Sequence, residues 1–309
     1  MGVKMVMAVT HPDWFRMLRE KSRREDLDEV NFWSPNAGQS FKALQPGELF
    51  LFKLRGSDKI AGGGVFSHAN SAPCSLAWSA FGEKNGAHSL VQLNQRMRSL
   101  HRDDLPPDED FEISCRILTR PFFFADEDHL TVPSDWSHKI LNYKTYSTDE
   151  DVGKKLWDDV LVRLQGMPFF EANEKVLATG APQIIRTRLG QGGFRILVTD
   201  IYRRRCSVSG ERTLPALEAA HIRASAEGGS CEAGNGLLLR SDIRKLFDEG
   251  YVTVNEDLRF EVSDKIYRRY GNGKSYYALR HRQILLPDNP DFHPKKASLR
   301  WHNEQRYKG

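Results

Sequence analysis

A histidine and an asparagine lie at the two ends of a glycine- and serine-rich stretch in the last third of the chain. His221 lies near the end of the run LEAAHI, and Asn235 is the first residue of the run NGLLL. Both of these runs are typical of strands. The stretch SDIRKLFDEG (241–250) then predicts a helix that is capped by Ser241 and ended by Gly250. The sequence therefore predicts a ββα unit that carries a histidine, the side chain best suited to accept a proton near neutral pH.

Four motifs in and around this unit resemble the HNH endonuclease family, in the branch found in bacterial restriction-type proteins. They are CSVSG (206–210), AAHI (219–222), GNGLLL (234–239) and LFDEGY (246–251). The resemblance covers about residues 200–265 and implies a ββα-metal fold that hydrolyses phosphodiester bonds. It assigns the general base to His221 and the orientation of the loop to Asn235. It also implies a divalent metal, Mg²⁺ or Mn²⁺, that bears charge developing on the phosphate.

The chain departs from the family pattern at two metal-binding positions. Arg244 lies where the family has a metal-binding His or Asn, and Ala220 lies where many members have an acidic ligand. A guanidinium has no lone pair to offer a cation. Three interpretations stay open: nearby acids such as Asp248, Asp242 and Glu218 supply the ligands, Arg244 contacts the scissile phosphate, or the unit is inactive and only grips DNA.

Simpler interpretations exist for the same residues. His221 is then a hydrogen-bonded structural residue, Asn235 belongs to a turn with the glycine after it, and Asp248 lies on the surface. The four cysteines form no CxxC pair, which argues against a disulfide scaffold and a zinc knuckle. We expect Cys206 and Cys231 to be reduced, small and buried.

Charge is distributed unevenly along the 309 residues. From residue 181 onward we count 23 Lys and Arg against 15 Asp and Glu, a net charge of +8, which leaves −4 for the first 180 residues. A basic half of this kind is expected where a module grips a phosphate backbone. The segment 191–206 predicts a helix, and we expect the basic face of this helix to contact DNA through Arg203, Arg204 and Arg205.

The first half reads as a β-rich core with flanking helices. Strands are predicted at VNFWSP, GELFLFKLRG, KIAGGGVFSH, FEISCRIL and HLTVP, because β-branched and aromatic runs alternate there with Gly, Asn, Pro and Ser. Helices are predicted at 89–101 and at 148–166, the second capped by Thr148 and ended by Gly166. This pattern predicts a small barrel.

The order of these runs resembles the PUA-like superfamily, in particular EVE domains, over about residues 10–160. That resemblance implies a pocket that holds a modified base flipped out of the duplex between aromatic rings. The aromatic candidates are Trp33, Phe66, Trp78 and Phe81, and each of them is equally a candidate for the core. The candidates for reading the base edge are Ser34, Asn36 and Ser67.

Together these observations predict an α+β protein with three segments. They are a β-barrel-like EVE/PUA-type domain at 1–166, a linker at 167–184 and an HNH nuclease domain at 185–309. We expect a type IV, modification-dependent restriction endonuclease that recognises 5-methyl- or 5-hydroxymethylcytosine in double-stranded DNA and forms a homodimer. The alternative is a reader of modified DNA whose HNH domain is inactive. No membrane segment is apparent, so we expect a cytoplasmic protein.

Overall fold

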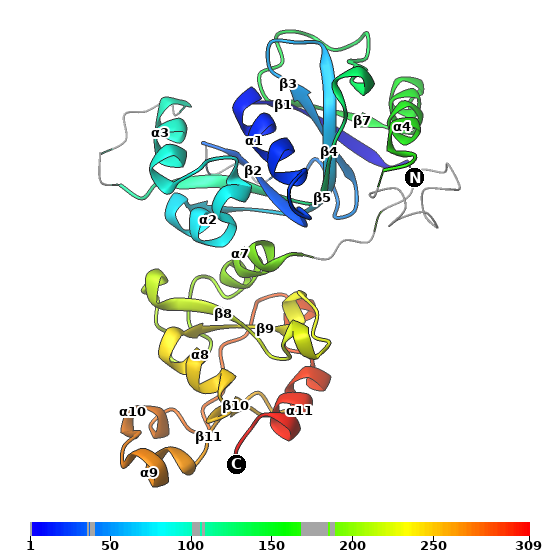
Figure 1. Ribbon diagram of the computed structural model, residues 1–309. Helices are drawn as coiled ribbons and strands as arrows, with labels where there is room; N and C mark the ends of the chain where they lie inside the picture. Colours follow the sequence, from blue (N-terminus) through cyan, green and yellow to red (C-terminus); the bar gives the residue numbers. More distant parts are fainter. Residues whose placement is uncertain are drawn as a thin grey trace. The chain divides into compact units, whose positions relative to one another are not determined.

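The computed structural model describes residues 2–35, 37, 41–100, 106, 109–167, 185 and 189–309. Its internal contacts divide the chain into two compact units, Met1–Gly193 and Phe194–Gly309 (Figure 1). Of the predicted linker at 167–184, only Met167 is described, so the predicted domain boundaries stay a prediction. The candidate edge reader Asn36 also lies outside the described residues.

One mixed sheet of seven strands forms the centre of the first unit. Its strand order is β2-β5-β4-β3-β1-β7, with β6 paired to β4. The strands are β1 (Lys4–Thr10), β2 (Glu29–Ser34), β3 (Leu49–Leu54), β4 (Lys59–Pro73), β5 (Glu112–Phe123), β6 (Leu130–Thr131) and β7 (Tyr143–Ser147). The helices are α1 (Pro12–Ser22), α2 (Cys74–Phe81), α3 (Leu90–Leu100) and α4 (Asp151–Leu164).

Helices cover both faces of this sheet, which explains why β1 and β3 are apolar at nearly every position. Alternate side chains of a strand point to opposite faces. Met5, Met7 and the residues that share their face pack with Trp157 of α4. Val6, Ala8 and their neighbours pack with α1. Strands buried on both faces read as continuous hydrophobic runs.

The prediction of a closed barrel is wrong. Closure requires the two end strands to pair with each other. In the described part of the chain, β2 pairs with β5 and β7 pairs with β1, and the sheet stays open between these two ends. The predicted strand set lacked β1, which lies parallel to β3 and antiparallel to β7.

The second unit contains the predicted ββα arrangement followed by a hairpin. Strands β8 (Leu217–His221) and β9 (Gly236–Arg240) pair antiparallel, and α8 (Ser241–Asp248) follows directly. The other elements are β10 (Val252–Val254), β11 (Phe260–Val262), α9 (Lys265–Tyr270), α10 (Lys274–Tyr277) and α11 (Lys296–Gln305). The strand, loop, strand, helix and hairpin order agrees with the sequence analysis, with ends shifted by one or two residues.

Some predicted helix ends are wrong. Helix α7 spans Gln191–Ile201 instead of continuing to residue 206, because Arg203 and Arg204 adopt positive φ angles of 52° and 55° that no α-helix allows. Helices α8 and α4 begin after Arg240 and Glu150, so Ser241 and Thr148 are not their N-caps. Gly250 follows α8 with a φ of 74°, as a terminating glycine does.

His302 of α11 lies in the core of the second unit. Its ring stacks on Phe247 of α8 at 3.8 Å, and its Nδ1 lies 2.8 Å from the Thr253 hydroxyl. Its Nε2 donates to the carbonyl oxygen of Phe247 at 3.1 Å. Burial lowers the pKa of His302 to about 4.

Among the described helices, none combines the length and the apolar character that a membrane span requires.

Acid should destabilise the second unit through His302. The unfolded chain binds a proton on this histidine near its ordinary pKa of 6.5, whereas the folded chain does so only near 4. The contribution of neutral His302 to the free energy of unfolding is fully present above about pH 6.5. It is lost as the pH falls towards 4, by about 3 kcal/mol in total. We expect thermal unfolding measured from pH 7 to 4.5 to show a shallower loss for His302→Gln than for the wild type. Equal slopes would contradict the assignment, and His88→Gln, at an exposed histidine, is the control.

Candidate functional site

The ββα unit places His221 at the end of β8, opposite the start of β9. His221 pairs with Gly236, and the amide of Ile222 donates to the carbonyl oxygen of Asn235 at 2.9 Å. Because α8 begins at the residue after β9, its side chains lie beside the β8–β9 ribbon without an intervening loop. Two strands and one helix therefore position the histidine.

The side chain of Asn235 braces the long loop between the two strands. Asn235 is only 2% exposed. Its Nδ2 donates to the carbonyl oxygens of Arg223 and Ser230 at 2.9 and 2.8 Å, and its Oδ1 accepts from the amide of Arg223 at 2.9 Å. These bonds fix the chain that leaves His221.

His221 lies in a half-buried position against an aromatic ring. It stacks on Phe194 of α7 with ring centroids 3.8 Å apart and planes 12° apart. Its Nε2 lies 3.5 Å from Sγ of Cys231, which is half-buried instead of buried as expected. Burial, and then the charge of Arg244, lower the pKa of His221. The lowered pKa favours the neutral imidazole, which is the form that can accept a proton.

Arg244 is paired with two carboxylates in this unit. Its Nη1 donates to Glu218 of β8, and its Nε lies 3.4 Å from Oδ2 of Asp248, one helical turn further along α8. Partial burial raises the pKa of Asp248, and Arg244 opposes that shift. Arg195 of α7 belongs to the same cluster: burial lowers the pKa of Arg195, while Glu218 raises it and Arg244 lowers it further.

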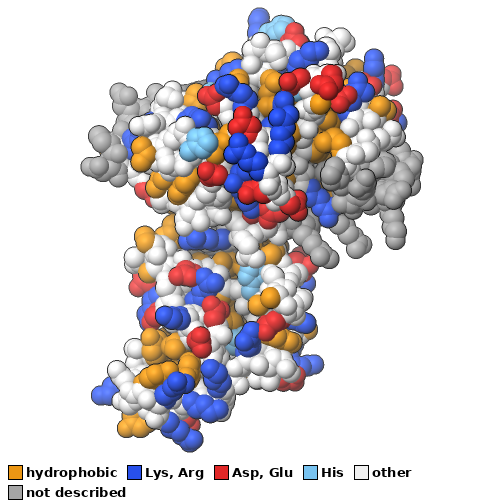
Figure 2. All heavy atoms as spheres, viewed as in Figure 1, with side chains coloured by type: hydrophobic (Ala, Val, Ile, Leu, Met, Phe, Trp, Pro, Cys, Tyr) orange, Lys and Arg blue, Asp and Glu red, His pale blue; other side chains and the backbone are white. Residues whose placement is uncertain are grey.

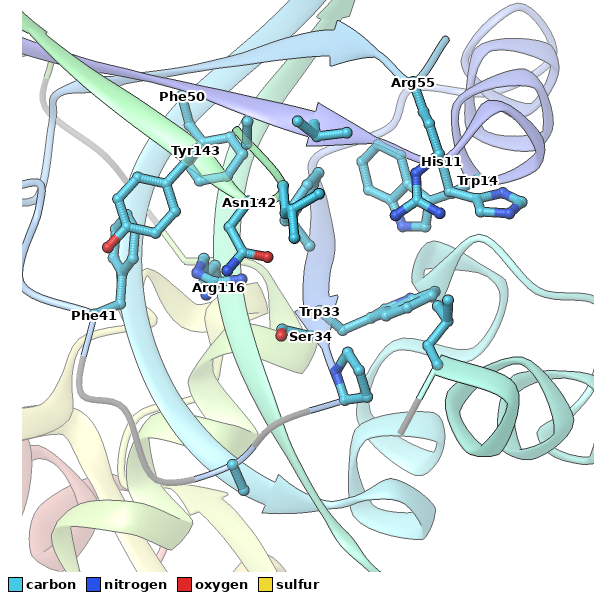
Figure 3. Close-up of a pocket in the computed structure, with 17 residues that line it drawn as sticks. His11, Trp14, Trp33, Ser34, Phe41, Phe50, Arg55, Arg116, Asn142 and Tyr143 are labelled. Carbon is cyan, nitrogen blue, oxygen red and sulfur yellow. The ribbon is translucent and has the colours of Figure 1, made fainter. Parts of the chain in front are cut away.

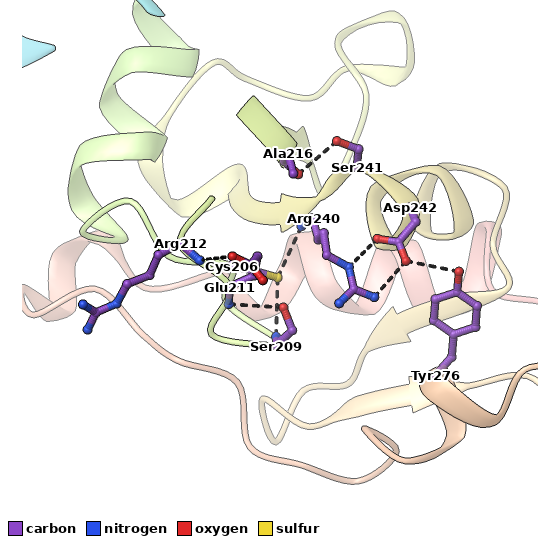
Figure 4. A network of polar contacts seen from close by, with 9 residues as sticks. All are labelled: Cys206, Ser209, Glu211, Arg212, Ala216, Arg240, Ser241, Asp242 and Tyr276. Carbon is purple, nitrogen blue, oxygen red and sulfur yellow. Dashed lines mark hydrogen bonds and ion pairs between the residues drawn. The ribbon is translucent and has the colours of Figure 1, made fainter. Parts of the chain in front are cut away.

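Asp242 belongs to a different network, at the start of α8 (Figure 4). Its carboxylate accepts from the guanidinium of Arg240 at 2.6 and 2.8 Å and from the hydroxyl of Tyr276 at 3.2 Å. Arg240 lowers the pKa of Asp242. The structure thus gives Asp242 structural partners and does not place it with Asp248.

In the same network, the amides of Ser209 and Arg240 approach the buried Sγ of Cys206 at 3.4 and 3.3 Å.

These residues do not fit a divalent metal ion. Metal ligands must offer lone pairs, and Arg244 offers only donors. Its guanidinium also pairs with Glu218 and Asp248, two of the acids nearest to it. Within the described ranges, no three or more His, Cys, Asp or Glu side chains cluster closely enough to hold a metal.

The predicted DNA contacts Arg203, Arg204 and Arg205 lie in the turn after α7 and not on a helix face. Arg203 pairs with Asp288. A second basic surface was not predicted from the sequence. Figure 2 shows Lys and Arg side chains gathered at the end of the second unit that carries α9 and α10. A hollow there is lined by Tyr251, Lys265, Arg268, Arg269 and Lys308. The signal was present in the KIYRRY run of α9, whose tyrosines are exposed.

A cavity of about 380 Å³ lies within the first unit (Figure 3). Its lining includes Trp33 and Ser34 of β2, as predicted for the base pocket, together with residues that the sequence analysis missed. The polar and aromatic lining residues that were not predicted are His11, Trp14, Phe32, Phe41, Phe50, Arg55, Arg116, Asn142 and Tyr143. None of the described lining residues is acidic.

Four of the predicted pocket residues do not line this cavity. Phe66 and Phe81 are buried, each 4% exposed, and Phe66 packs behind the cavity wall against Phe41 at 5.2 Å. Ser67 of β4 and Trp78 of α2 are half-buried elsewhere.

The ββα geometry agrees with a comparison of the chain with known families. Residues 206–255 match the family model of HNH endonuclease. The chain thus carries an HNH endonuclease domain in this segment. HNH endonucleases generally use a divalent metal, so the cluster around Arg244 is a departure from the family.

Comparison with whole proteins adds little. A solved structure titled "Modification dependent TagI restriction endonuclease" is similar over 93% of this chain and 78% of that chain, with 13% identity and a TM-score of 0.28. No curated protein matches the chain. The family match over residues 206–255 therefore carries the assignment.

The loop of the HNH domain should open when Asn235 is replaced. Asn235→Ala removes three buried hydrogen bonds, which we expect to lower the local free energy of opening by about 2–4 kcal/mol. Hydrogen–deuterium exchange of peptides covering residues 217–240 should accelerate accordingly. Asn289→Ala, which loses one exposed bond to the amide of Asp291, is the control. Unchanged exchange in Asn235→Ala would show that the side chain does not brace the loop.

Proposed function

We propose that this chain is a modification-dependent DNA endonuclease. The HNH domain hydrolyses a phosphodiester bond, and the cavity of the first unit accepts a modified cytosine, 5-methyl- or 5-hydroxymethylcytosine, flipped out of the duplex. The observation that carries the proposal is the position of His221 at the end of β8, where the chain that follows it is braced by Asn235, inside the segment that matches the HNH family.

His221, Arg195 and Arg244 of the second unit supply a general base and two positive charges in this proposal. His221 takes a proton from a water molecule, whose oxygen bonds to phosphorus while the bond to the leaving sugar oxygen breaks and that oxygen gains a proton. Arg195 and Arg244 bring two guanidinium groups to the same cluster, and guanidinium groups form strong, bidentate contacts with phosphate. Arg244 exchanges its contacts with Glu218 and Asp248 for the phosphate in this scheme.

The cavity of the first unit supports recognition of a flipped base. Aromatic rings restore the stacking energy that a base loses on leaving the duplex. Trp33, Phe41 and Tyr143 supply such rings, and the described lining has two arginines and no acid. Cutting both strands requires two HNH units, so we propose that the chain acts as a homodimer on DNA.

A second candidate function is a reader of modified DNA that does not cut. The specific observation in its favour is Arg244, whose ion pairs occupy the acids of the HNH domain. The basic hollow beside α9 and the cavity would then bind DNA without hydrolysis.

A cleavage assay separates the two functions. Full-length protein is incubated with duplexes that carry cytosine, 5-methylcytosine or 5-hydroxymethylcytosine, with Mg²⁺, with Mn²⁺ and with EDTA. We expect the wild type to cut modified duplexes and His221→Ala to lose at least 100-fold in rate while binding the same DNA. His281→Ala, at an exposed histidine that pairs with Glu261, is the matched control.

Three outcomes decide between the functions. Cleavage by His221→Ala at the wild-type rate would contradict the HNH mechanism. Cleavage only by the Arg244→His variant would establish the reader, with a nuclease disabled at one position. Equal cleavage of modified and unmodified duplexes would leave a nuclease without the proposed dependence on modification.

A further inference from the structure

Arg116 occupies an unusual place for a charged side chain. It lies on β5, an interior strand of the sheet, where it is flanked by Phe32 of β2 and Ala69 of β4. Its neighbours along the strand, Cys115 and Ile117, are fully buried. A charge in such a position costs free energy unless it has a partner.

The protein gives this guanidinium almost no compensation. Its one described favourable contact is a cation–π contact with the ring of Phe41, whose centroid lies 5.0 Å from Cζ. Its Nε is inaccessible and has no hydrogen-bond partner, and the described residues provide no ion pair for it. Burial lowers the pKa of Arg116, which is the expected effect of an uncompensated charge. Arg116 as a whole is half-buried and lines the cavity, so a ligand there can reach the remaining N–H groups of the guanidinium and supply acceptors that the described residues do not.

The surroundings of Arg116 suit a flat ligand. In Figure 3, Arg116 and Asn142 point into the space between Trp33 on one side and Phe41 and Tyr143 on the other. The indole N–H of Trp33 donates to the carbonyl oxygen of Asn85 at 2.7 Å, which fixes the ring and leaves its face for stacking. A planar ring between these aromatics would present its edge to Arg116.

The hydrogen-bonding character of the two polar groups selects among such rings. A guanidinium only donates, so it needs adjacent acceptors in one plane. Cytosine presents its O2 and N3 acceptors together, with an amino group beside them that the Oδ1 atom of Asn142 can accept from. Thymine and uracil place an N3–H donor in the same position, facing the guanidinium. A substituent at C5 does not change this edge.

We propose that Arg116 reads the Watson–Crick edge of the flipped base and so selects cytosine, modified or not, over thymine and uracil. The proposal rests on the proposed function, because it takes a flipped base as the ligand of the cavity. Asn142 contributes the acceptor for the amino group. Recognition of the C5 substituent is then a separate contact from recognition of the base.

Four duplexes separate these two kinds of recognition. They carry cytosine, 5-methylcytosine, uracil or thymine at one position, opposite an abasic site so that no base pair has to be broken. Binding of the full-length protein is measured by fluorescence anisotropy at two salt concentrations. We expect the wild type to prefer cytosine over uracil, and 5-methylcytosine over thymine, by roughly 10- to 100-fold.

Variants at position 116 test whether this preference comes from Arg116. In Arg116→Met both edge preferences should fall to near unity, while the preference for a methyl group, measured as 5-methylcytosine over cytosine, should persist. Arg116→Lys should keep the charge but lose most of the edge preference, because an ammonium cannot form the paired contact. Arg24→Met, at an exposed arginine that does not line the cavity, should keep the edge preference.

Each outcome decides the proposal. A wild type without edge preference, or an Arg116→Met variant that retains it, would overturn the proposal. Equal weakening of all four duplexes with a smaller salt dependence would place Arg116 on a phosphate and also overturn it. If Arg116→Met does not fold, Arg116→Lys decides. A wild type that distinguishes cytosine from uracil but ignores the methyl group would instead contradict the proposed dependence on modification and leave the edge reading intact.

Discussion

The ion pairs of Arg244 with Glu218 and Asp248 determine what the HNH domain can bind. They bring one strand and one helix of the ββα unit together around a fixed positive charge. Burial, and then that charge, lower the pKa of His221 and so favour its neutral form. Asn235 holds the connecting loop so that this arrangement persists. The scaffold is therefore that of a nuclease, while the charges inside it are arranged differently.

A second arginine in the first unit is in the opposite situation. Both guanidinium groups have an Nε without a hydrogen-bond acceptor, but Arg244 lies beside two carboxylates, whereas the described partner of Arg116 is the ring of Phe41. A paired guanidinium stabilises a site from within, and an unpaired one binds a ligand with little loss of existing contacts. This difference supports the proposed recognition role of Arg116, which breaks no ion pair when it binds, whereas Arg244 must exchange its ion pairs before it binds a phosphate.

The sequence predicted the HNH domain well because its signals are local. The spacing of His221 and Asn235, the apolar strands and the following helix all lie within about 35 residues, and the structure places them as expected. Partners of the acids were harder to predict. Asp242 was a candidate metal ligand, but Arg240 two residues away and Tyr276 on α10 take its carboxylate. A contact across 34 residues of chain leaves no trace in a local pattern.

The first unit was predicted less completely because its order depends on long-range pairing. Strand β1 packs parallel to β3 and moves the sheet away from a closed barrel, and its run of apolar residues carries no signal of that neighbour. The cavity is likewise assembled from segments as distant as His11 and Tyr143. Trp33 was predicted from its aromatic, turn-flanked position, whereas Arg116 gains its meaning only from the absence of a partner in three dimensions.

The most direct test of the role of Arg244 is a titration of the full chain with Mn²⁺, followed by electron paramagnetic resonance of the free ion. We expect the wild type to bind no ion that depends on Asp248, so the wild type and Asp248→Asn give the same binding curve. Arg244→His should gain one ion per chain, because a histidine supplies a lone pair and releases both carboxylates. That ion should be lost again when Asp248→Asn is added. A wild type that binds one ion per chain and loses it in Asp248→Asn would contradict the account.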